Sequence, residues 1–102
     1  MISEFIKIKK MIIKKHLIIS GKVQGVGFRY WMKNLAINND ISGWVKNKFS
    51  GDVEALIIGQ EKEVQKLLKQ CKIGPCSANI QNIQINDHDQ DYLKEGFNIL
   101  RL

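Results

Sequence analysis

The chain has 102 residues, of which 44% are hydrophobic and 25% are charged, and its formal net charge is +6. This length suits one globular domain with a single core, and no stretch approaches the ~20 apolar residues of a membrane-spanning helix. The positive charge suits an anionic partner, but it does not distinguish a metabolite from a nucleic acid.

The first ten residues, MISEFIKIKK, precede a second methionine, Met11. They lack the apolar core and cleavage site of a signal peptide, so we expect a cytoplasmic protein. We interpret residues 1–10 as an N-terminal extension, dispensable if translation starts at Met11, and residues 11–102 as the domain. Alternation within residues 5–9 would also allow a short extra strand.

Apolar periodicity predicts seven elements. In chain order they are a strand over 16–23, a helix over 28–38, strands over 41–47 and 53–58, a helix over 60–72, a strand over 80–85 and a last short strand over 97–102. Gly59 is expected to break the third strand, and residues 86–90 to form a polar loop. The order βαββαβ, with an extra short C-terminal strand, predicts an α+β sandwich in which two helices cover one face of a largely antiparallel sheet.

A glycine-rich loop joins the first strand to the first helix, in the segment ISGKVQGVGFR from Ile19 to Arg29. Glycines allow the backbone to bring its N–H groups close to a ligand, and a helix N-terminus adds partial positive charge. Such a loop is suited to bind an anion. The spacing of Gly21, Gly25 and Gly27 fits neither the dinucleotide fingerprint nor a nucleotide P-loop. We therefore expect a small phosphate group as the ligand, not a nucleotide.

Two polar side chains near this loop are candidate site residues. Arg29 lies where the loop becomes the helix, and a guanidinium can bind two phosphate oxygens at once. Most helical arginines are solvated surface residues, but the glycines before Arg29 favour a functional role. Asn47 ends the second strand, where its amide could reach the same pocket. Taken alone, Asn47 is more simply a turn residue.

Together, the two segments resemble the acylphosphatase family. The first matches that family's signature I-x-G-x-V-Q-G-V-x-F-R from Ile19 to Arg29, and the second matches its other signature from Gly43 to Asn47 and at Gly51, Val53 and Gly59. The resemblance extends from His16 to Leu102 and leaves out the extension. It implies a ferredoxin-like sandwich.

The resemblance also implies hydrolysis of acyl phosphates to a carboxylate and inorganic phosphate. In this interpretation Asn47 positions the attacking water, and the phosphate is bound by Gln24, Gly25, Val26, Gly27, Phe28 and Arg29. The carboxylate is a good leaving group and phosphoryl transfer depends on positioning and charge, so we expect no metal and no cofactor. The expected partners are an acyl phosphate and inorganic phosphate, the latter as product and competitive inhibitor, with a monomer as the default state.

Two alternatives belong to other classes of protein. A non-catalytic module that binds RNA could share this order of elements, and the chain is basic. The RNA motif, however, requires outward-facing aromatic residues on the third strand, and Val53–Ile58 contains none. A domain that only binds a protein partner is also compatible with the fold, although Arg29 and Asn47 argue against it.

The remaining chemistry-bearing residues have simpler interpretations. The segment from Asp87 to Asp91 could be imagined as a metal site, but such runs are more often solvated loops. His16 is interpreted as structural. Cys71 lies on the apolar helix face and Cys76 lies in a loop, so we expect neither a disulfide framework nor a zinc site.

Overall fold

The computed structural model describes residues 11–89, 91–92 and 94–101. The predicted extension 1–10 and its possible strand lie outside these residues, and so does Gln90. The elements are β1 (Ile12–Lys22), α2 (Phe28–Asn38), β2 (Ser42–Asn47), β3 (Val53–Gln60), α3 (Glu61–Ile73), β4 (Asn79–Asp87) and β5 (Phe97–Leu100).

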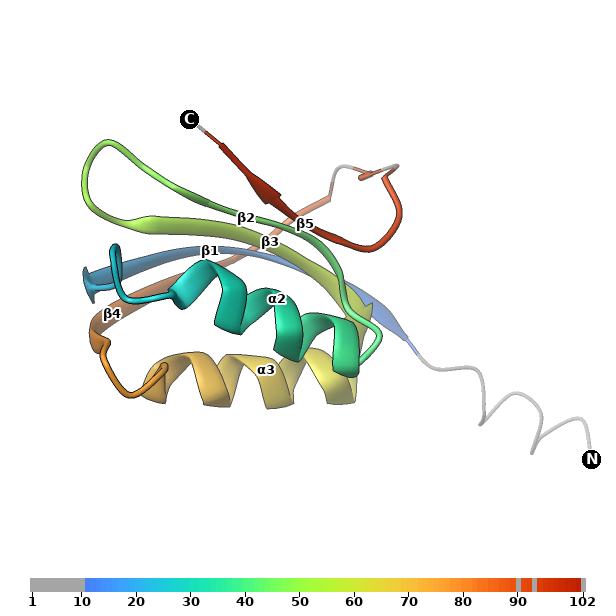
Figure 1. The fold of residues 1–102 in the computed structure, drawn as a ribbon. Helices are drawn as coiled ribbons and strands as arrows, with labels where there is room; N and C mark the ends of the chain where they lie inside the picture. Colours follow the sequence, from blue (N-terminus) through green and yellow to red (C-terminus); the bar gives the residue numbers. More distant parts are fainter. Residues whose placement is uncertain (1–10, 90, 93, 102) are drawn as a thin grey trace, which may run out of the picture.

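The five strands form one sheet in the order β4-β1-β3-β2-β5, and both helices lie on the same face of it (Figure 1). This arrangement confirms the predicted βαββαβ ferredoxin-like sandwich with its extra strand. The predicted antiparallel sheet is antiparallel everywhere except at one edge, where β5 pairs parallel to β2. The parallel pair arises because the chain crosses the whole sheet between β4 and β5.

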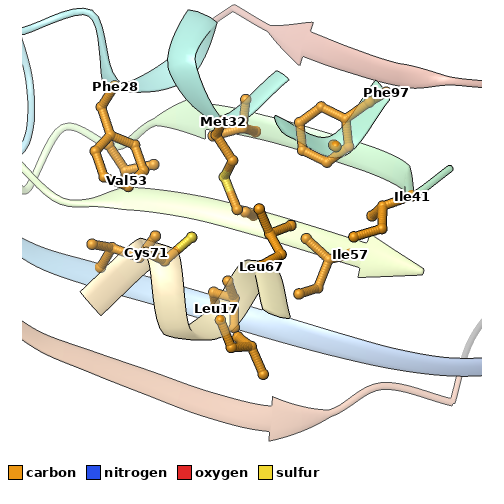
Figure 2. Packing of buried hydrophobic residues seen from close by; sticks show 14 of the residues in the cluster. Leu17, Phe28, Met32, Ile41, Val53, Ile57, Leu67, Cys71 and Phe97 are labelled. Atoms are coloured by element: carbon orange, nitrogen blue, oxygen red, sulfur yellow. The ribbon is translucent and has the colours of Figure 1, made fainter. Parts of the chain in front are cut away.

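The core fills the space between the helices and the sheet. Figure 2 shows side chains from both helices, including Phe28, Met32, Leu67 and Cys71, against residues such as Leu17 on the strands. These residues are almost completely buried, and they occupy the alternate strand positions and the helix stripe that the sequence pattern indicates. Burial raises the pKa of the Cys71 thiol to about 12, so this cysteine is an inert core residue.

Most predicted boundaries agree with the structure to within one or two residues, and the differences at β1, β4 and Gly59 have physical reasons. The first strand begins at Ile12 because residues 12–15 pair with β3, and β4 continues to Asp87 where a polar loop was expected. Gly59 lies inside β3 and does not end it. A Cβ at position 59 would lie 3.1 Å from the Ile41 side chain, so this glycine provides close packing and not a chain break.

The connection between β4 and β5 crosses the face of the sheet that carries no helix. We call this connection, residues 88–96, the strap. The His88 ring stacks on His16 of β1 with the centroids 6.4 Å apart, and the Lys14 ammonium lies 2.7 Å from the Asp91 carboxylate. Asp87, just before the strap, pairs with Lys15. The segment from Asp87 to Asp91, which was predicted to be a solvated loop, therefore starts in β4 and is held against β1 by ion pairs.

Beneath the strap, His16 makes a close contact with an acidic residue of β3. Its Nε2 atom lies 2.7 Å from Glu54 Oε2, and Lys46 lies 3.6 Å from the other carboxylate oxygen. Burial by itself raises the pKa of Glu54, but hydrogen bonding to His16 and the charge of Lys46 outweigh it and leave the pKa lowered. His16 thus has a structural partner that the sequence did not indicate.

Candidate active site

The loop between β1 and α2, residues 24–27, has a backbone suited to binding an anion. Gly25 and Gly27 have φ values of 74° and 77°, in the left-handed region that favours glycine. A Cβ at either position would meet no atom within 4 Å, so the glycines are required by conformation and not by crowding. The space beside this stretch of backbone is open to a ligand.

The N-terminus of α2 follows directly and keeps its positive end unneutralised. Gly27 is the N-cap, no side chain caps the helix, and no acidic residue lies in its first turn. The first N–H groups of a helix have no partner within the helix and carry roughly half a positive charge together. Loop and helix therefore present donors at one place.

Arg29 lies in the first turn of α2 and is partly buried. Within residues 11–89, 91–92 and 94–101, no acidic side chain forms an ion pair with its guanidinium. A guanidinium without a carboxylate partner at a helix N-terminus can bind an anion without first breaking an internal ion pair. This is the position that the sequence predicted for a phosphate contact.

Gln24 connects the loop to the hairpin between β2 and β3. Its side-chain Nε2 donates hydrogen bonds to the carbonyl oxygens of Lys48 and Asp52, each at 2.8 Å. The side-chain nitrogen is thus occupied by the hairpin, and a phosphate contact from Gln24 would come from its backbone. Figure 1 shows the loop and the hairpin turn at the same end of the sheet.

Asn47 is the last residue of β2 and lies directly before that turn. Its carboxamide oxygen Oδ1 is buried and accepts no hydrogen bond from the part of the chain that the structure describes. An unpaired buried polar atom costs on the order of 1–3 kcal/mol, and such atoms often mark functional positions. The Gln24 bonds hold the loop beside this residue, so the structure brings the two predicted parts of the site together.

Two other predicted loop residues serve mainly as anchors. Phe28 is buried and its ring lies 5.2 Å from that of Trp31, while Val26 is partly buried against the core. Their side chains fix the loop at both ends, which leaves only their backbone groups to contact a phosphate. This anchoring gives a defined shape to the exposed Gly27, which lies between them, and to Gly25 just before Val26.

No metal-binding group is found among the residues described: no three His, Cys, Asp or Glu side chains gather there. No helix in the described ranges is long and apolar enough to cross a membrane.

Comparison with known proteins identifies this arrangement. The acylphosphatase family model matches residues 15–99. The chain belongs to the acylphosphatase family. The acylphosphatase of Acidiphilium cryptum is 48% identical over 71 residues, which cover 70% of this chain and 78% of that protein. The crystal structure of the Bacillus subtilis acylphosphatase superposes with a TM-score of 0.82 at 32% identity, covering 88% of this chain and 99% of that one. As a member of this family, the present protein hydrolyses acyl phosphates.

A larger protein also contains this fold. Full-length HypF, in a phosphate- and nucleotide-bound form, matches with a TM-score of 0.78 at 26% identity, and the match covers 89% of this chain but only 12% of HypF. The predicted alternative of RNA binding on the face without helices is disfavoured by the strap, which crosses that face against His16.

The sequence did not reveal how Gln24 joins the loop to the hairpin, or which residue lies beside Asn47 on the next strand. The register of β2 with β5 pairs Lys46 with Leu100, so the next residues are Asn47 and Arg101. Only the parallel pairing of these strands brings Arg101 to this end of the sheet. The one feature of the sequence that could have pointed to Arg101 is the rarity of arginine, since Arg29 and Arg101 are the chain's two arginines.

Proposed function

We propose that Arg29 and the backbone N–H groups of residues 24–28 bind the phosphoryl group, and that Asn47 orients the water that attacks it. The observation that carries this proposal is the buried Oδ1 of Asn47, which has no hydrogen-bond partner among the described residues and lies beside an open glycine loop. In the reaction, the water oxygen forms a bond to phosphorus and the bond from phosphorus to the acyl oxygen breaks. The products are a carboxylate and inorganic phosphate.

The chemistry asks little beyond positioning and charge. The leaving carboxylate is stable, so no strong general acid is needed, and the transition state spreads negative charge over the phosphoryl oxygens. Arg29 and the N-terminus of α2 stabilise that charge, while the Asn47 amide, which has no useful basicity, holds the water in line. We propose that the reaction needs no metal ion for these reasons.

We also propose that the working unit is a single chain in the cytoplasm, with inorganic phosphate as a competitive inhibitor. The loop, the helix N-terminus and Asn47 all belong to one chain, which supports the first point. Cys71 and Cys76 are both free thiols, as is usual in a reducing compartment. Product inhibition follows because inorganic phosphate presents the same oxygens to the same donors.

The test is hydrolysis of benzoyl phosphate by the purified protein in EDTA, with Arg29→Ala and Asn47→Ala compared with wild type. We expect Arg29→Ala to lose about 10²–10³-fold or more in kcat/KM, the typical cost of removing a preorganised charge-stabilising group. Asn47→Ala should lower kcat strongly while the inhibition constant of phosphate changes little. Neither variant should unfold at a lower temperature than wild type, because neither side chain belongs to the core and both reduce the stability of the folded chain.

Wild-type turnover in the Arg29→Ala protein would exclude Arg29 as the phosphate ligand. Equal losses of kcat and of phosphate inhibition in Asn47→Ala would mean that Asn47 binds phosphate and does not orient the water. Loss of wild-type activity in EDTA, restored by a divalent cation, would refute the metal-independent mechanism.

A further inference from the structure

Arg101 directly follows β5, whose pairing with β2 ends at Lys46 and Leu100, so the same register continued by one residue brings Arg101 level with Asn47. The two strands run parallel, and Figure 1 shows them heading toward the end of the sheet that carries the β2–β3 turn. Phe97 is buried and Ile99 packs against the core, so odd-numbered residues of β5 face the helices. Arg101 is exposed and is the first residue after β5, and the alternation of the strand, continued to it, would direct its side chain to the same face, on the side of Asn47.

A second contact connects Arg101 to the first turn of α2. Its guanidinium lies near enough to the Tyr30 phenol to lower the pKa of Tyr30, through hydrogen bonding and through its charge, with a smaller contribution from Arg29. Tyr30 is the neighbour of Arg29 in the chain and is 55% exposed. Both arginines therefore lower the pKa of one phenol, in the first turn of α2.

The charge of the phosphoryl group explains why a second arginine near Arg29 would be useful. A phosphoryl group near neutral pH carries about 1.5 to 2 negative charges, whereas Arg29 supplies one positive charge and a helix N-terminus supplies about half of one. One more cation would balance the ligand. Two guanidiniums close together repel each other unless an anion lies between them. The Tyr30 phenol is therefore a suitable partner for the Arg101 guanidinium when no phosphate is bound.

We infer that Arg101 is a second phosphate-binding residue, which contacts the phosphoryl oxygens from the β5 side while Arg29 contacts them from the helix side. The inference rests on the proposed role of Arg29 and adds a ligand that comes from a different part of the chain. Because substrate and product carry the same phosphoryl oxygens, Arg101 strengthens the binding of both. It contributes to affinity more than to the chemical step.

The experiment measures benzoyl phosphate hydrolysis and competitive inhibition by inorganic phosphate in Arg101→Gln. We expect KM and the phosphate inhibition constant to rise together, roughly three- to tenfold, with kcat changed less than about twofold. Arg101→Lys should recover part of the affinity, because a lysine keeps the charge but not the bidentate geometry. Lys69→Gln, which removes one exposed positive charge from α3, is the matched control and should behave as wild type.

The ultraviolet titration of tyrosine checks the geometry independently of catalysis. Arg101→Gln should raise the pKa of the Tyr30 phenol, and Tyr30→Phe identifies which of the tyrosine signals belongs to it. An unmoved phenol pKa would show that Arg101 does not lie there and would overturn the inference. So would a moved pKa with unchanged phosphate inhibition.

Arg29→Ala, measured in parallel, separates the two proposals. If Arg29→Ala weakens phosphate inhibition and Arg101→Gln does not, only the inference about Arg101 fails. If Arg29→Ala leaves phosphate inhibition intact, the proposed phosphate site itself is wrong.

Discussion

The two helices begin at opposite ends of the sandwich, and their first turns are built for different purposes (Figure 1). The first turn of α3 contains Glu61 and Glu63, and Lys72 lies in its last turn, so its charges complement the helix dipole. The first turn of α2 contains Arg29 and no acidic residue, and a left-handed glycine precedes it. The α3 end favours stability of the helix, whereas the α2 end gives up that stabilisation and remains free to bind an anion.

This difference shows which end of the molecule gives up folding stability. Both helices pack on the same face of the same sheet, so packing does not explain the contrast. Stability is reduced by a repulsive cation in the first turn of α2 and by the buried Asn47 oxygen, which no described residue hydrogen-bonds, and both lie at the same end of the molecule. These groups reduce stability at the place where a bound ligand can pair with them.

Among the changes that test this comparison of the two helix ends, the largest effect is expected from altering the shape of the loop before α2. Gly25→Ala should lower kcat/KM about 10²-fold, because a loop shifted by about 1 Å no longer aims its N–H groups at the phosphate. The stability cost should be only ~1–2 kcal/mol, the strain of a left-handed alanine. Activity and urea unfolding measure the two effects.

Gly96→Ala in the strap is its matched control, since Gly96 has the same φ of 74° and a Cβ there also meets no atom within 4 Å. It should lose similar stability and keep full activity. Equal activity losses in the two variants would mean that Gly25 acts only through global stability.

A smaller effect is expected from giving α2 the acidic first turn of α3. Tyr30 occupies the third helical position of α2, as Glu63 does in α3. Tyr30→Glu should therefore gain about 0.3–1 kcal/mol of stability from the helix dipole while losing roughly tenfold in kcat/KM by repelling the phosphate. Tyr30→Gln, measured by the same unfolding and kinetic assays, is the neutral control. A Tyr30→Glu protein with unchanged affinity for phosphate would contradict the proposed site.

The smallest effect is the reverse change in α3. Glu63→Gln should lose about 0.3–1 kcal/mol of stability, because it removes a negative charge from the positive end of the helix dipole. Loss of the ion pair between Glu63 and Lys66, at 3.6 Å, adds little to this cost. We expect kcat/KM to remain at the wild-type value. A change in activity would show that the two helix ends are coupled and that the contrast between them is not local.

Much of the fold was predictable because the apolar pattern is local and regular. Phe28, Met32 and Ala36 recur at helical spacing and all are buried, as their positions indicate. The start of β1 was not predictable in the same way. Lys14 and Lys15 interrupt the apolar pattern, and the residues that pair with them, Asp91 and Asp87, are 77 and 72 residues away in the chain.

The candidate site divides in a similar manner. Arg29 and the glycines lie in one continuous segment, so their proximity follows from the sequence alone. Asn47 was expected to reach the same pocket because it ends the second strand, but only the resemblance to a family favoured a functional role over that of a turn residue. The Gln24 bonds to backbone carbonyls of the hairpin and the approach of Arg101 depend on strand register, which no local pattern encodes.

The order of the sheet also bears on how the chain folds. Its three inner strands, β1, β3 and β2, are complete by Gln60, whereas β4 and β5, which form the two edges, both come from residues 79–100. A nascent chain that lacks this last part would expose two unpaired strand edges at once, and such edges readily pair with other chains. Both edges are therefore protected only after the three inner strands have been made, when the strap has carried the chain from one edge to the other.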